Sequence, residues 1–252
     1  MAARKISIVE SAGSSAPRRD EPANPALWVC GLLQAGDSFF PTGSYAHSYG
    51  LEGLVQEGVV RDRATLRDFI FLSALPALGH AELPLAAHAW RAFGAPDWTE
   101  IGELCVLSSA LRSTREARMA SENIGRQRAE LAANLRDSAL AREFLRRSTE
   151  HHWPGATAVS AALEGRVLGA PLPAILAGVS YASLASLLSA AMKLLRLGQN
   201  GAQSLLTEAL ATAPKFIAAA EQIPRNEIGW FNPWLDIAAA RHETADSRMF
   251  IS

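Results

Sequence analysis

Beyond residue 10 the sequence contains no sustained alternation of apolar and polar residues, which is the pattern of a half-buried β-strand. Apolar side chains recur instead at intervals of three and four residues, the spacing that places them on one face of an α-helix. This periodicity predicts an all-α fold, a single-domain bundle of about eight to ten helices. The segments expected to be helical are 25–36, 44–57, 65–75, 99–111, 112–135, 138–149, 153–168, 174–197, 202–210 and 233–241.

Local signals mark the limits of several of these helices. Asp62 is expected to cap the helix that follows it, and Asn232-Pro233 joins a capping residue to a proline in the first helical position. Pro76 and Pro84 are expected to divide the apolar stretch after residue 75, because proline has no backbone N–H to donate inside a helix. The segment 174–197 is apolar almost all round, which predicts a central place in the bundle.

The helical domain is expected to span residues 25–241, between two irregular segments. Residues 1–24 combine serine, glycine and several prolines, which predicts a disordered, mobile N-terminal tail. Residues 242–252 follow the last expected helix and contain Met249 and Phe250, which are unfavourable in a freely exposed end. We therefore expect this C-terminal tail to dock on its own domain or on another chain.

The charge balance excludes several classes of function. Among 252 residues, 24 Lys and Arg stand against 25 Asp and Glu, which gives a formal net charge of -1 without a block of like charge. Binding to nucleic acid phosphates needs clustered positive charge, so this class is not expected. None of Lys5, Lys193 and Lys215 follows a glycine, so the P-loop pattern of nucleotide hydrolases is missing. The low lysine content also disfavours a basic membrane-surface helix.

Two further features indicate a cytoplasmic protein. Cys30 and Cys105 match neither a disulfide framework nor a zinc cluster, so we expect reduced thiols. The N-terminal region has no apolar run of signal-peptide length. The longest uncharged window, 167–192, contains Pro171 and Pro173 and many serines, so we do not expect it to span a membrane.

Ser44 and His47 are the candidate nucleophile and base of a helical hydrolase. A helix from Ser44 would place both on one face together with Ser48. No Gly-x-Ser-x-Gly elbow and no orienting acid accompany them, so a packing or recognition role is favoured. The six histidines occur without His-Glu-x-x-His or Pro-Cys-x-x-Cys, so we expect neither a metal site nor a cofactor.

The segment 112–135 alternates arginines with glutamates. This pattern is typical of a solvated helix with ion pairs between residues four apart. The alternative is a binding face for an acidic partner.

Three segments carry a resemblance to a known family. The first contains LLQ at 32–34 and DSFFPTGSYAHSYGLE at 37–52, and the second is LGQNGAQ at 197–203. The third contains RHET at 241–244 and SRMFIS at 247–252. In order, spacing and position these segments resemble the UreF family of urease accessory proteins, over about residues 27–252.

The resemblance implies an all-helical, non-catalytic scaffold. Members of this family form homodimers, bind UreD (also called UreH) and recruit the GTPase UreG, so that nickel enters apo-urease. The resemblance assigns Tyr45 and Arg248 to the complex that recruits the GTPase. It also implies that the C-terminal tail becomes ordered when UreD/UreH binds.

The expected protein-binding residues lie in the first and third segments. They are Tyr45, His47, Arg248, Met249 and Phe250. In the isolated chain we expect the tail, residues 242–252, to be poorly ordered, because ordering about ten residues costs on the order of ten kcal/mol of backbone entropy.

Tyr45 and His47 are expected at or near a protein-binding surface, since tyrosine combines contact area with a hydrogen-bonding hydroxyl. The alternative is an aromatic core plug of Phe39, Phe40 and Tyr49 that Tyr45 completes.

Overall fold

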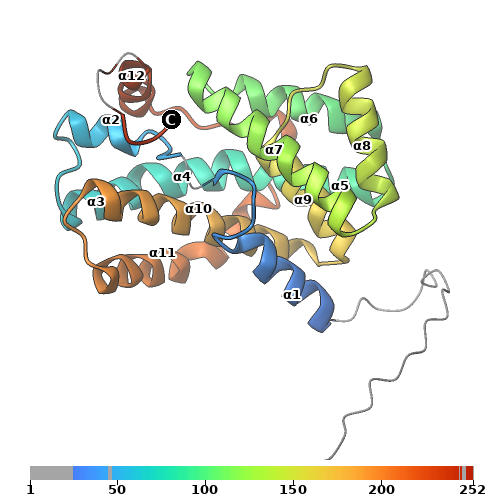
Figure 1. Ribbon diagram of the computed structural model, residues 1–252, viewed down its shortest axis with the longest axis horizontal. Helices are drawn as coiled ribbons and strands as arrows, with labels where there is room; N and C mark the ends of the chain where they lie inside the picture. Colours follow the sequence, from blue (N-terminus) through green and yellow to red (C-terminus); the bar gives the residue numbers. More distant parts are fainter. Residues whose placement is uncertain (1–24, 45–46, 244, 246–247, 252) are drawn as a thin grey trace, which may run out of the picture.

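The computed structural model describes residues 25–44, 47–243, 245 and 248–251, and the expected N-terminal tail, residues 1–24, lies outside them. The described chain forms ten helices and no strand, so the expected all-α class is confirmed (Figure 1). One of the ten is the continuous helix Arg63–Gly94. The elements are α1 (Pro25–Gly36), α2 (Leu51–Gln56), α3 (Arg63–Phe69), η2 (Ile70–Ala74), α4 (Leu75–Ala77), η3 (Leu78–Glu82), α5 (Leu83–Gly94), α6 (Trp98–Ala110), α7 (Arg115–Leu135), α8 (Ala139–Glu150), α9 (Thr157–Leu168), α10 (Leu172–Leu194), α11 (Gln199–Ala220), the short 3₁₀ turn η4 (Arg225–Glu227) and α12 (Pro233–His242).

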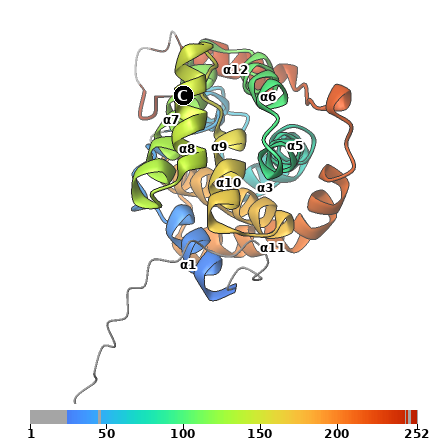
Figure 2. The ribbon, with the colours of Figure 1, turned by 90° about the vertical axis from the view of Figure 1, so that its right-hand side faces the viewer.

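The core is built around α5. Leu83, Leu85 and Ala89 on this helix are completely buried. Figure 2 shows α5 almost end-on, among α6, α9 and α11, and it packs against all three. At the other end of the molecule α12 lies over α2 (Figure 1). This second contact positions the candidate site.

The expected helix breaks at Pro76 and Pro84 are absent. The helix passes each proline through a π-helical turn, η2 before Pro76 and η3 before Pro84, in which the closing N–H groups of Leu75 and Leu83 donate five residues back. Such a turn widens the helix, which relieves the clash between a proline ring and the carbonyl four residues earlier. The prolines therefore reshape this helix without ending it.

Pro84 also creates a tertiary contact. Because it has no N–H, it leaves the carbonyl of His80 without its usual helical donor, and the N–H of Gly229 donates to that oxygen at 2.9 Å. The Trp230 ring stacks on the His80 ring with 5.5 Å between centroids. The segment that leads into α12 is thereby held against the long helix.

Helix α2 begins at Leu51, not near Ser44 as expected. Tyr49 and Gly50 have φ values of 56° and 79°, in the left-handed region, which a right-handed helix cannot include. A Cβ at residue 50 would lie 2.7 Å from a side-chain atom of Leu235 on α12, so glycine serves both the turn and the packing. The expected helical face shared by Ser44 and His47 does not form.

The two predicted helix caps are confirmed. Asp62 Oδ1 accepts the N–H of Thr65 at 2.8 Å, and Thr65 Oγ1 accepts the N–H of Asp62 at 3.1 Å, which completes a capping box. Asn232 Oδ1 accepts the N–H of Leu235 at 3.3 Å, with Pro233 in the first helical position. One predicted end is wrong: α11 continues past Leu210, because later residues such as Ala213 are also buried in the core.

Helix α10 packs against α1, α2, α5, α9 and α11, in agreement with its apolar surface. By length and composition alone, α10 and the helix Arg63–Gly94 could each cross a membrane. Half of the most apolar window of each helix is buried inside the domain, and core helices of a packed domain meet the same criterion.

The charged helix α7 does not follow the expected pattern, since ion pairs from this region reach other elements. Arg128 Nε lies 3.3 Å from Glu164 Oε2 on α9, and Arg112 Nη2 lies 2.6 Å from Glu82 Oε1. Burial raises the pKa of Glu164, an effect that the charge of Arg128 opposes. Arg128 therefore connects α7 to α9, and Arg112 connects the start of this region to the long helix Arg63–Gly94.

Candidate protein-docking site at the C-terminal tail

The close crossing of α2 and α12 brings together two residues from opposite ends of the chain. A Cβ at Gly53 would lie 2.6 Å from the backbone oxygen of Ala238, so only glycine permits this approach. Glu52 on α2 and His242 at the end of α12 consequently face each other.

His242 lies between two carboxylates and is 3% exposed. Its Nε2 is 2.9 Å from Glu52 Oε2, and its Nδ1 is 3.2 Å from Glu116 Oε2 in the first turn of α7. Glu243 Oε1 accepts the N–H of Glu116 at 3.0 Å, so the end of α12 and the start of α7 are joined twice. We call Glu52, Glu116 and His242 the carboxylate–histidine cluster.

The same carboxylates hold the C-terminal tail. Glu52 Oε1 accepts the N–H of Met249 at 2.7 Å, and Glu52 Oε2 accepts the N–H of Phe250 at 3.0 Å. Arg248 Nη1 donates to Glu116 Oε1. Every described residue from 248 to 250 is therefore bound to the cluster by a charge-assisted hydrogen bond.

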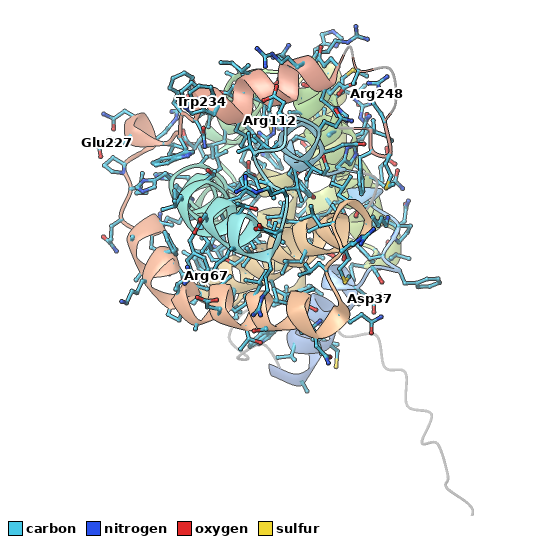
Figure 3. The ribbon with its side chains drawn as sticks, turned by 90° about the vertical axis from the view of Figure 1, so that its left-hand side faces the viewer. Asp37, Arg67, Arg112, Glu227, Trp234 and Arg248 are labelled. Carbon is cyan, nitrogen blue, oxygen red and sulfur yellow. The ribbon has the colours of Figure 1, made fainter. Side chains whose placement is uncertain are left out.

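The tail presents some side chains outward and buries one. Phe250 is 5% exposed, and Lys193 Nζ on α10 lies 5.2 Å from its ring centroid. The flanking Met249 and Ile251 are 61% and 62% exposed. Figure 3 shows Arg248 and Trp234 toward opposite ends of α12. The tail thus combines a buried anchor with apolar side chains open to a second molecule.

The expected poor order of residues 242–252 in the isolated chain stays a prediction, and residues 244, 246, 247 and 252 lie outside the described ones. The described residues of the tail dock on their own domain, the first of the two alternatives raised by Met249 and Phe250. The physical reason is that one buried carboxylate, Glu52, accepts two consecutive backbone N–H groups, and these offset part of the entropy lost on ordering.

The predicted residues of the first segment are placed differently. Tyr45 lies outside the described residues. His47 is buried, and its expected place at or near a protein-binding surface stays a prediction; burial lowers its pKa, an effect that the charge of Glu116 opposes. The alternative core plug does not form as one unit either, because Phe39 is 93% exposed while Phe40 is buried.

A cavity of about 340 Å³ lies beneath the cluster. Its walls include His242, Glu116, Glu82, Arg112 and Tyr49. Tyr49 is 44% exposed as a whole residue, but its phenol end lines the cavity, where desolvation raises its pKa and a hydrogen bond to Ser186 works in the opposite direction. The hydroxyl is therefore a hydrogen-bonding group at this site and remains protonated.

The Ser44–His47 pair lacks the geometry of the hydrolase alternative. Ser44 Oγ accepts a hydrogen bond from Thr42 Oγ1 at 3.3 Å, and the Ser44 carbonyl accepts the N–H of His47 at 3.4 Å. The two residues are thus joined by a backbone turn. Within the described residues, no group of three or more His, Cys, Asp or Glu side chains is arranged to hold a metal ion.

Comparison with known proteins assigns the fold to a family. The UreF family model matches residues 60–210. The urease accessory protein UreF of Pseudomonas fluorescens (strain SBW25) is 35% identical over 91% of this chain and 100% of the relative. The protein of the same name from Methylibium petroleiphilum is 31% identical over 94% of this chain and 100% of the relative. The chain belongs to the UreF family. Its role in urease maturation follows from this membership.

The resemblance to UreF read from three short segments is therefore confirmed. In the structure, the first and third UreF segments meet at the carboxylate–histidine cluster, through Glu52 and His242. The second segment supplies Gly198, the residue that precedes α11. Two of the three segments thus form one site.

Sequence reasoning did not identify Glu52 or Glu116 as functional residues of this UreF chain. Glu52 closes the first UreF segment and could have been singled out on that ground. Glu116 had no local signal, because it looked like one charge in a solvated helix. Only the packing of α12 against α2 and α7 shows what these carboxylates bind.

Proposed function

We propose that this chain is a non-catalytic scaffold of urease maturation that binds UreD/UreH and recruits the GTPase UreG, so that nickel can be inserted into apo-urease. Membership of the UreF family carries the proposal, because the relatives are named as accessory proteins. The seated tail supports it, since Met249 and Ile251 remain exposed on a segment anchored at Phe250. Nickel is cargo in this scheme, and the chain needs no cofactor of its own.

The five proposed protein-binding residues have distinct roles. Arg248 and Met249 contact the partner, as their side chains are 39% and 61% exposed. Phe250 is the buried anchor of the tail. His47 acts from behind the surface, next to Glu116. The role of Tyr45 rests on the family resemblance alone.

Exposed aromatic residues on α12 and just before it support a role in binding other proteins. Phe231 and Trp234 are 76% and 77% exposed, and Trp230 is 42% exposed. Tryptophan and phenylalanine are enriched in protein interfaces because they provide large, rigid contact areas. The proposed partners are UreD/UreH, UreG, apo-urease and a second copy of this chain, all in the cytoplasm and without nucleic acid or membrane.

Copurification tests the scaffold directly. Tagged chain, coexpressed with UreD/UreH and UreG, should retain both, and a chain ending at residue 247 should retain much less of each. The truncation removes the tail anchor but keeps His242 and α12. Equal recovery with the full and shortened chains would contradict the assigned role of the tail.

Activity assays separate the scaffold from the hydrolase alternative. The purified chain alone should hydrolyse neither GTP nor activated esters above the buffer rate. Turnover that disappears in Ser44→Ala would favour the hydrolase.

A further inference from the structure

The carboxylate–histidine cluster binds the tail through atoms that also bind His242. Glu52 Oε2 accepts the N–H of Phe250 and lies 2.9 Å from His242 Nε2. Glu116 binds Arg248 through Oε1 and His242 through Oε2. The ring of His242 and the tail are therefore seated on the same two carboxylates.

We infer that His242 is a proton-dependent positioning residue: its doubly protonated ring holds Glu52 and Glu116 in the geometry that seats the C-terminal tail for partner binding. This inference rests on the proposed function for the partner-binding step. Seating of the tail in the isolated chain is independent of it.

Hydrogen-bond chemistry sets the protonation state of the seated form. An ionised carboxylate only accepts hydrogen bonds, and a neutral imidazole has one donor and one acceptor nitrogen. Both nitrogens of His242 face carboxylate oxygens, so both must carry hydrogen to avoid an acceptor against an acceptor. The two anions Glu52 and Glu116 are then balanced by two cations, the doubly protonated His242 and Arg248.

Loss of one proton unbalances the cluster. One ring nitrogen would then turn a lone pair toward a carboxylate oxygen, and the repulsion would be weakly screened because His242 is 3% exposed. The cluster would hold two anions against the single charge of Arg248. If Glu52 moved away from the ring, the N–H of Phe250 would lose its acceptor. If Glu116 moved away, Arg248 would lose its acceptor.

Other charged groups surround the cluster on every side. His47 precedes α2 and interacts with Glu116, and Glu243 accepts the Glu116 N–H from the end of α12. Across the cavity lies the pair of Arg112 and Glu82, and Lys193 of α10 sits over the Phe250 ring. On α12 itself Asp236 binds Ser113 and Arg241 pairs with Glu57.

Among these groups, the histidines are the side chains that ordinarily lose a proton between about pH 5 and 8. His242 contacts both carboxylates directly, whereas His47 influences Glu116 through its charge. The seated tail should therefore be favoured at the acidic end of this range and released as pH rises.

Hydrogen exchange in the isolated chain tests the switch. The amides of Met249 and Phe250 are followed by mass spectrometry of the C-terminal peptide, with rates divided by those of the same peptide free in solution at each pH. In the natural chain, protection should fall at least tenfold between about pH 6 and 8. In His242→Gln the amides of Met249 and Phe250 should be poorly protected at every pH. The neutral glutamine amide cannot replace a ring that donates a hydrogen bond to each of the two carboxylates.

His151→Gln is the matched control, because His151 is exposed and stacks on Trp153 away from the tail. It should reproduce the natural pH dependence. His47→Gln tests the neighbouring histidine and should keep the dependence on pH. Circular dichroism checks each variant for folding, and if His242→Gln fails to fold, the pH profile of the natural chain and of Glu116→Gln decides.

Protection that does not change with pH in the natural chain, or a pH dependence that survives in folded His242→Gln, would overturn the switch. Binding of UreD/UreH at the same pH values is measured separately. A pH-dependent tail in a chain that never binds UreD/UreH would overturn the partner-binding step and the proposed function, while leaving the tail switch supported. A tail that is insensitive to pH in a chain that binds UreD/UreH would overturn the switch alone.

Discussion

Glu52 shows how much of the C-terminal structure depends on one carboxylate. It is 4% exposed, and its oxygens face the ring of His242 and the amides of Met249 and Phe250. A buried charge is tolerated only when paired and hydrogen-bonded, and these donors meet that condition. Removing the charge therefore affects the end of α12 and the tail together.

We expect Glu52→Gln to lower the free energy of unfolding by about 3 kcal/mol, because the buried groups around residue 52 lose an acceptor and the new NH₂ group opposes a donor. Glu57→Gln on the next turn is the control; its partner Arg241 is 71% exposed, so the change should be below about 1 kcal/mol. Urea unfolding measures both variants. Equal stability of the two would contradict the importance of the buried cluster.

The two cysteines should differ sharply in reactivity. Burial raises the pKa of the Cys105 thiol to about 12, so at pH 8 it stays protonated and unreactive. Cys30 on α1 is exposed. Iodoacetamide at pH 8 should add one label to the native chain and two after unfolding, as counted by mass spectrometry. Labelling of native Cys105 would show that α6 opens readily.

At the scale of elements, close backbone approaches decide which helices meet. The contact of α2 with α12 needs Gly53. The turn before α2 needs Gly50, because a Cβ there would collide with the Leu235 side chain of α12. Pro84 acts in the same way on the long helix, because it frees the His80 carbonyl for Gly229. These glycines and this proline determine the position of α12, and the position of α12 determines where His242 lies.

Gly53→Ala should destabilise the chain by about 1 to 3 kcal/mol, because the new Cβ would lie 2.6 Å from the Ala238 oxygen and the helices must separate. The tail should become more accessible at the same time. Gly198→Ala is the control, since nothing lies within 4 Å of its Cβ position, and its effect should stay within about 0.5 kcal/mol. Thermal unfolding and limited proteolysis measure the two effects.

At the scale of the whole molecule, the last part of the chain presents several exposed apolar side chains to solvent. The exposed Phe231 and Trp234 and the outward Met249 and Ile251 all belong to the last part of the chain. Their substitution should affect assembly with other proteins more than folding. Arg248 allows the sharpest test because it joins the tail to α7.

Arg248→Ala should reduce recovery of UreD/UreH and UreG in copurification at least severalfold. It should change the free energy of unfolding by less than about 1 kcal/mol, because the side chain is 39% exposed. Arg248→Lys should restore binding only in part, since lysine lacks the planar fork of arginine. Arg142→Ala, which removes an exposed pair with Asp137, should leave recovery unchanged. A loss of stability as large as the loss of binding would show Arg248 to be structural.

Local features of the fold could be predicted because their causes lie within a few residues. The caps at Asp62 and Asn232 each join groups three residues apart, and helical periodicity is likewise a local pattern. The tail drew attention because Met249 and Phe250 are unusual in a free end. The breaks expected at Pro76 and Pro84 were wrong, because a π-helical turn before each proline lets the helix continue.

The sequence by itself determined the helical class, the caps at Asp62 and Asn232 and the family to which the chain belongs. Only the tertiary structure decided that His242 would stand between Glu52 and Glu116, which are 190 and 126 residues away. A charge on an amphipathic helix looks the same in sequence whether it meets water or a buried histidine. Its partner depends on how helices cross, and that follows from side-chain and backbone contacts summed over the whole core.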